Sequence, residues 1–290
     1  MLLLDMMRAP EFTEEDYKFF EYICRAYLAY DPKYSAHFLG IMVKDSQETN
    51  FKFSAEGLVL KWIRPGENSG ICGAFNPLWP RSFFLTANEE RSYLFPKTKE
   101  DIEAEKAFEV ADRSSVIQAA TKRSMKDIKF LEFNSVASWM ILQFPTISHE
   151  LYHMFQYKTS KVGYIAMRLI TVFTCIPYYL FQNAEWMPTF RKFFEWDLEG
   201  QAEKWGNNAP NMEAFCEELE NGKQAFVWKR RCEDSIERYR QEDNMPEEEI
   251  VEIEQNNEAN WKLQYDGLTP FQKEWGKGLY DLIVECASKY

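Results

Sequence analysis

The pattern of apolar and polar positions changes twice along the chain. Apolar residues first recur at helical spacing, between a possible cap at Thr13 and a stop at Asp31-Pro32, which predicts a first helix. From 51 to 63 apolar and polar residues alternate instead, as they do in a strand. Two further short apolar runs, ICGAF and SFFLTA, also predict strands. We therefore expect a small antiparallel sheet at about 51–86.

After Pro96 most of the chain has helical periodicity. The spacing over 99–125 predicts a long amphipathic helix, whereas the alternating run IKFLEF, 128–133, predicts another strand. A helix at about 145–158 should begin at Pro145, because proline is tolerated in the first helical turn. From 211 to the end nearly every segment indicates helix. The chain should thus be mainly helical.

Composition and charge narrow the class of protein. The 290 residues are 46% hydrophobic and 16% aromatic, which is typical of a folded globular chain with a sizeable core. The net charge of −12 would repel phosphate backbones, so we expect no nucleic-acid partner. The six cysteines show no C-x-x-C spacing and are interpreted as reduced thiols. No conventional export signal is visible, so we expect a cytoplasmic protein, or one exported without a conventional signal peptide.

One apolar segment, Tyr164–Phe181, has nearly the length of a membrane span. Arg168 interrupts it and Pro177 breaks its helical pattern. We therefore expect no membrane partner. The segment should instead be a buried element or the apolar wall of a cleft.

The segment TISHELYHMFQY contains two of the three histidines in the chain. On a helix, His149 and His153 lie one turn apart on the same face, so both imidazoles can reach one metal ion. Zinc takes two such nitrogens at about 2.0–2.1 Å. Glu150 falls beside that position, where its carboxylate can accept a proton from a metal-bound water. This is the H-E-x-x-H arrangement of zinc peptidases.

A third ligand is expected among the acids of the later stretch FFEWDLEGQAEKWG. Glu195, Glu199 and Glu203 share one helical face there. We favour Glu199 as the ligand, with Glu203 as an outer carboxylate that accepts the free N–H of a liganding histidine. In a rival register Glu195 is the ligand and Glu199 the outer carboxylate, and Glu203 itself is a third choice. Gly200 and Ala202 are small, which would let this helix pass close to the histidine helix.

These residues resemble a known group of enzymes. H-E-x-x-H followed by a glutamate on a second helix resembles the gluzincin clan of zinc metallopeptidases. The run His149–Tyr157 is similar to the HExxHxxQ helix of metallopeptidases encoded near bacterial contractile injection systems and polymorphic toxins, and Glu199–Glu203 looks like their E-x-x-A helix. The resemblance covers about 135–206. Leu198 stands where thermolysin-like enzymes commonly have asparagine.

The resemblance implies a fold. We expect an α+β, mainly helical protein with a zincin-like core, in which a small antiparallel sheet accompanies two metal-bearing helices. The metallopeptidase domain should span 1–208, and a helical C-terminal region, 209–290, should pack on it.

The resemblance also implies one Zn²⁺, held by His149, His153 and Glu199, with Glu150 as general base for hydrolysis of a peptide or protein substrate. A hydrogen-bond donor to the developing oxyanion is needed as well. Four tyrosines are candidates for it: Tyr157, Tyr164, Tyr178 and Tyr179. The alternative is a zincin-like binding or structural protein without catalysis. Near-stoichiometric zinc with an open coordination position would favour the enzyme.

Overall fold

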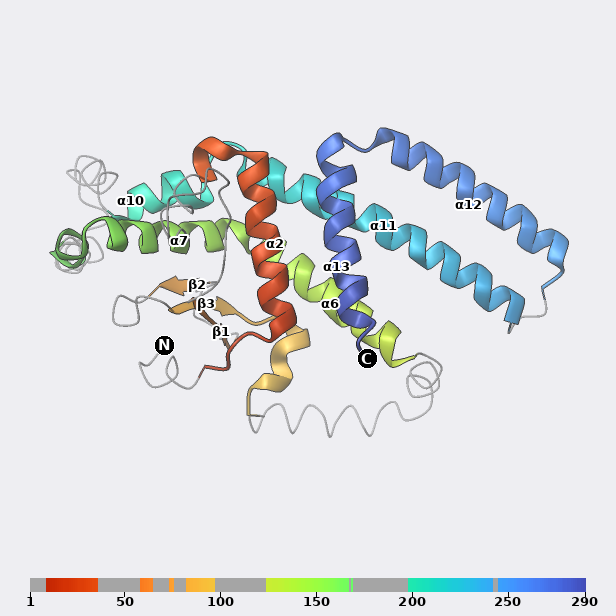
Figure 1. Cartoon of the computed structure of the whole chain (residues 1–290), viewed down its shortest axis with the longest axis horizontal. Coiled ribbons are helices and arrows are strands. Elements are labelled where there is room, and N and C mark those ends of the chain that lie inside the picture. Colours follow the sequence, from red (N-terminus) through yellow and green to blue (C-terminus); the bar gives the residue numbers. More distant parts are fainter. Residues whose placement is uncertain are drawn as a thin grey trace, which may run out of the picture.

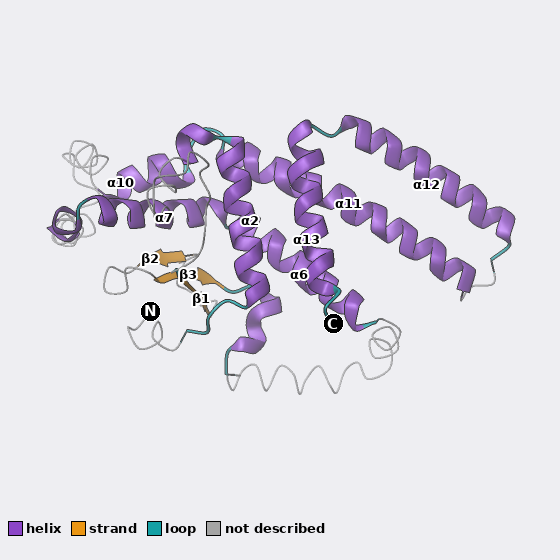
Figure 2. Cartoon of the chain, viewed as in Figure 1, coloured by secondary structure: helices purple, strands orange, loops and turns teal. Residues whose placement is uncertain are grey.

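The computed structural model describes residues 9–35, 58–64, 73–75, 82–96, 124–166, 168, 198–241 and 245–290. Helices dominate this part of the chain (Figure 2). Several sequence predictions lie outside it: nearly all of the helix at 99–125, the start of the predicted sheet, and most of the apolar segment 164–181. Among the described helices, none combines the length and the apolar composition needed to cross a bilayer.

Helix α2, Glu14–Tyr30, confirms the first predicted helix. Its N-terminus is closed by a capping box, in which the Thr13 hydroxyl accepts a hydrogen bond from the Asp16 N–H at 3.2 Å and the Asp16 carboxylate accepts the Thr13 N–H at 3.0 Å. Its apolar face is fully buried. The helix therefore runs through the centre of the core, beside the sheet and α13 (Figure 1).

Within the described residues the sheet has three short strands in the order β1-β3-β2: β1 is Val59–Ile63, β2 is Gly73–Phe75 and β3 is Ser82–Thr86. The predicted antiparallel sheet is wrong, because β1 and β3 pair in parallel and only β2 runs antiparallel to β3. The first four residues of β3 are all buried, as expected of a central strand covered on both faces. The alternating pattern shows one strand at a time and carries no information on the direction of its partner.

Helix α6, Met125–Leu142, occupies the place of the predicted strand at 128–133, so that prediction is wrong. The run IKFLEF fits both periods, and Ser124 decides the outcome by capping a helix through the Asp127 N–H. The next helix, α7, Phe144–Thr159, has a proline in its first turn and confirms the helix predicted from Pro145.

The last third of the described chain is helical. After α10, Leu198–Ala202, comes a π-helical turn, η2, Glu203–Asn207. Helices α11, Met212–Gln241, and α12, Glu247–Gly267, form a long antiparallel arm that extends from the rest of the molecule (Figure 1). A second π-helical turn, η3, Gln272–Gly276, leads into α13, Lys277–Ala287, which lies beside α2. Buried residues of α11 and α13 belong to the same hydrophobic cluster as those of α2, β3, α6 and α7.

A buried ion pair connects the sheet side of the core to two helices. Arg91, in the 3₁₀ turn η1, Glu89–Leu94, donates to the Asp16 carboxylate at 2.6 Å, and both residues are fully buried. Arg91 also contacts Glu132 of α6, and the indole of Trp62 donates to Asp16 at 3.0 Å. These contacts fix the positions of η1, β1, α2 and α6 relative to one another.

Candidate metal centre

The two histidines of α7 point their ring nitrogens at each other. The Nε2 atoms of His149 and His153 are 3.1 Å apart, and the rings stand edge to face. Two nitrogens bound to one tetrahedral zinc at about 2.0–2.1 Å lie about 3.3 Å from each other. His153 is buried and His149 is half-buried. The helix therefore brings the two nitrogens to nearly the separation that one zinc ion requires.

Gln156, about one turn after His153 on α7, contacts the ring nitrogen of His153 that faces away from His149. The Gln156 side-chain oxygen lies 2.8 Å from His153 Nδ1. Its amide nitrogen donates to the Leu198 carbonyl at 3.1 Å and to the Gln201 side-chain oxygen at 3.2 Å. Gln156 is itself buried. It thus connects the inner histidine to α10, the helix that contains Glu199.

Glu203 lies on the outer side of His149. Its Oε2 is 3.6 Å from His149 Nδ1, slightly beyond hydrogen-bonding distance. Its other oxygen accepts a hydrogen bond from the Asn208 side chain at 2.6 Å. Because the Nδ1 atom points away from the His153 ring, Glu203 is placed to orient His149 and not to share its Nε2. The role of Glu203 as the outer carboxylate stays a prediction.

Gly206 brings η2 into direct contact with α7. A Cβ atom added at Gly206 would lie 2.4 Å from the Cα of His149 and 2.7 Å from its backbone nitrogen. Ala202, one turn earlier, is fully buried. The small residues expected at this crossing were Gly200 and Ala202, and sequence reasoning missed Gly206. Its spacing of four residues from Ala202 was the available signal. A π-helical turn such as η2 often accompanies a functional site.

The proposed third ligand is placed only by its backbone. Glu199 is the second residue of α10, next to the Leu198 carbonyl that Gln156 binds, and its side chain lies outside the described part of the structure. Its rival, Glu195, also lies outside the described residues. Glu150 follows His149 on α7 and is half-buried. Among the side chains that the structure describes, no group of three His, Cys, Asp or Glu forms a complete metal site.

Of the two candidate tyrosines that the structure describes, Tyr164 packs beside the His153 ring. Its ring centroid is 6.2 Å from that of His153, and the Tyr157 ring packs edge to face with the Tyr164 ring at 5.7 Å. Tyr164 is buried, and its hydroxyl oxygen accepts a hydrogen bond from Arg168 at 2.8 Å, so the phenolic hydrogen can point to another acceptor. Tyr178 and Tyr179 lie outside the described residues.

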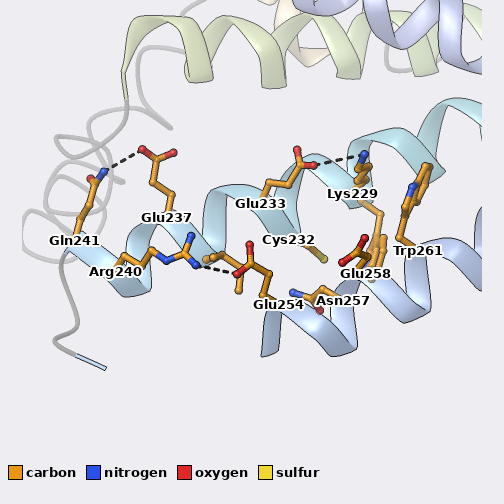
Figure 3. A pocket seen from close by; sticks show the side chains of 12 residues that line it. Lys229, Cys232, Glu233, Glu237, Arg240, Gln241, Glu254, Asn257, Glu258 and Trp261 are labelled. Atoms are coloured by element: carbon orange, nitrogen blue, oxygen red, sulfur yellow. Dashed lines mark hydrogen bonds and ion pairs between the residues drawn. The ribbon is translucent and has the colours of Figure 1, made fainter. Parts of the chain in front are cut away.

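A groove of about 650 Å³ lies between α11 and α12, on the arm and away from the histidine helix (Figures 1 and 3). Trp228, Ile236 and Trp261 line its apolar part. Several of the charged groups around it already form ion pairs. The Arg240 guanidinium donates to Glu254 across the groove at 2.8 Å, and Lys229 lies over the Trp261 ring. We therefore place the candidate site at the histidine pair and not in this groove.

Comparison of the chain with family models, with curated proteins and with solved structures gives no match. The likeness to gluzincins consequently rests on the motif residues themselves.

Proposed function

We propose that the chain is a zinc-dependent metallopeptidase of the gluzincin type, with a zincin-like core. The observation that carries the proposal is the pair of Nε2 atoms 3.1 Å apart on one face of α7, next to the base candidate Glu150. Two rings so arranged by a helix, one of them buried and held from behind by Gln156, suit a shared metal ion.

The donor set fits zinc. His149 and His153 would supply two imidazole nitrogens, and Glu199 a carboxylate from the neighbouring helix. Such a set of two histidines and one glutamate leaves a coordination position open for catalysis. When bound in a site of this kind, zinc supplies Lewis-acid polarisation of a carbonyl group and activation of water.

The protein's own residues would supply proton transfer and orientation. The Glu150 carboxylate would accept a proton from the attacking water and return it to the leaving amine. Glu203 would orient His149 through Nδ1, as its position in the structure allows. The hydroxyl of Tyr164, whose ring packs beside that of His153, would donate a hydrogen bond to the oxygen of the cleaved carbonyl.

The first experiment is elemental analysis of the purified protein. We expect about one zinc per chain in the wild type and loss of zinc in His153→Ala. His37→Ala is the matched control, because it removes the one histidine outside the motif and should leave the zinc content unchanged. Full zinc retention in His153→Ala would rule out the metal assignment.

A second measurement separates the enzyme from a binding protein. Glu150→Gln should keep zinc, since the residue is not a ligand, and should lose most cleavage of a peptide library because an amide cannot accept the proton. Zinc at full content with no cleavage by the wild type would favour the non-catalytic zincin-like protein.

The choice between the acids is tested by zinc affinity. Glu199→Gln should abolish tight binding, whereas Glu203→Gln should weaken it about 10- to 100-fold, as expected for an orienting partner of a ligand. Glu195→Gln should have little effect. If Glu195→Gln weakens zinc binding more than Glu199→Gln does, Glu195 is the ligand, as in the rival register.

A further inference from the structure

We infer that Gln156 is a positioning residue of this centre, which fixes His153 as the tautomer with hydrogen on Nδ1 and fastens the histidine helix to α10. The tautomer follows from the hydrogen bonds alone, whereas its consequence for zinc rests on the proposed function.

The orientation of the Gln156 amide is set by a backbone group. The Leu198 carbonyl oxygen can only accept a hydrogen bond, and the Gln156 Nε2 lies 3.1 Å from it. The NH₂ end of the amide must therefore face α10. This assignment does not depend on which way the Gln201 side chain is turned. The other end, the Gln156 carbonyl oxygen, then faces His153 Nδ1 at 2.8 Å.

The protonation of the His153 ring follows directly. A carbonyl oxygen has no hydrogen to donate, so Nδ1 must carry the proton. In the neutral imidazole the Nε2 atom then carries the lone pair, and this is the atom that faces His149. His153 is buried, so water cannot easily replace the glutamine as acceptor. The ring is thus prepared to bind a cation through Nε2 before any cation arrives.

The same side chain also sets the distance between the two helices. Leu198 immediately precedes Glu199, and Gln201 follows two residues later, so both acceptors of the Gln156 amide flank the proposed third ligand. A buried hydrogen bond from α7 to this backbone limits how far Glu199 can move from the histidines. Gln156 therefore acts on two of the three proposed ligands without being one of them.

The test uses the full-length, metal-free protein with ¹⁵N-labelled histidine. NMR chemical shifts of the ring nitrogens report which one carries the proton, and His37→Ala and His149→Ala variants assign the signals of the three histidines. In the wild type we expect hydrogen on Nδ1 of His153. In Gln156→Leu, which has no acceptor, we expect the population to move toward hydrogen on Nε2.

Two further variants separate positioning from simple packing. Gln156→Glu keeps an acceptor for Nδ1–H but removes both hydrogen bonds to α10, so it should retain the Nδ1 tautomer. Gln143→Leu makes the same chemical change at the start of α7, where the side chain forms no capping hydrogen bond, and should leave the tautomer as in the wild type. Zinc affinity, measured by chelator competition, should fall about 10- to 100-fold in Gln156→Leu and stay unchanged in Gln143→Leu.

The outcomes are distinguishable from those of the proposed function. If the wild type binds no zinc, the proposal of a metallopeptidase is ruled out, whereas the tautomer measurement still decides the role of Gln156. An unchanged His153 tautomer in Gln156→Leu would overturn the inference. If Gln156→Leu fails to fold, Gln156→Glu decides alone, and a move toward hydrogen on Nε2 in that variant would contradict it.

Discussion

Gly206 and His149 are in backbone contact, since a Cβ atom on the glycine would lie 2.4 Å from the Cα of the histidine. The added methyl group of Gly206→Ala would meet main-chain atoms that cannot rotate away. We expect η2 and α7 to separate, with a loss of about 1–3 kcal/mol in the free energy of unfolding. Zinc affinity should fall as well, because Glu199 and Glu203 lie on the displaced side. Urea denaturation and chelator competition measure the two effects.

Gly267 offers the matched control for this prediction. It is the last residue of α12, and a Cβ atom there would meet nothing within 4 Å. Gly267→Ala should leave zinc affinity unchanged and could raise stability by about 0.4–1 kcal/mol, since alanine restricts the unfolded chain. Equal losses in the two variants would mean that the contact with His149 is not the cause.

The buried pair of Arg91 and Asp16 predicts a large loss of stability on removal of one partner. Arg91→Met would leave the Asp16 carboxylate buried without its counter-charge, and we expect a loss of about 3–5 kcal/mol in the free energy of unfolding. The Trp62 indole and the Thr13 N–H would still donate to Asp16, which keeps the helix cap in place. The midpoint of urea denaturation is the measurement.

The surface pair of Lys277 and Asp281 provides the comparison. Both side chains are about half exposed, at 53% and 52%. Lys277→Met removes a cation from an i, i+4 helix pair, as Arg91→Met removes one from the core, and should change stability by less than about 0.5 kcal/mol. A similar small effect in both variants would show that the Arg91 pair contributes no more than a surface contact.

The sequence predicted those features that depend on near neighbours in the chain. Thr13 marked the start of α2, and Pro145 marked the start of α7. The pairing of His149 with His153 followed from helical spacing, and the structure places their Nε2 atoms together. The direction of the β1–β3 pair was mispredicted, because strand periodicity is the same for parallel and antiparallel partners.

The rest of the site depends on contacts between distant segments. Gln156 is part of the HExxHxxQ resemblance, but only its hydrogen bond to the Leu198 carbonyl shows that it is a buried connection to α10. The spacing of Gly206 from Ala202 indicated a face of small residues, but only the tertiary structure shows that Gly206 contacts the backbone of His149. Local patterns thus indicated the proposed ligands, whereas the groups that contact them are set by tertiary packing.

Lys223 gives a prediction that can be checked by pH. Its side chain is fully buried in α11, where the ammonium group contacts the Asn134 carbonyl oxygen, the Ser138 hydroxyl and, at 3.2 Å, the Glu220 carboxylate. Burial lowers the pKa of Lys223, and Glu220 opposes this shift only in part. In the unfolded chain the lysine has a pKa of about 10.4. At pH values between the pKa of Lys223 in the folded protein and that in the unfolded chain, the unfolded chain binds more protons than the folded protein.

Stability should therefore rise with pH across this window, from the lowered pKa of the folded state up to about 10.4. Lys223→Met removes the titrating group at similar volume, so the free energy of unfolding of the wild type, minus that of the variant, should increase with pH there. Tyr22 and Tyr27, whose pKa values burial raises, favour unfolding at high pH in both proteins, and their effect cancels in the difference. Urea denaturation at a series of pH values measures this difference in the free energy of unfolding. A difference that stays constant with pH would show that Lys223 remains charged in the folded protein over the whole range.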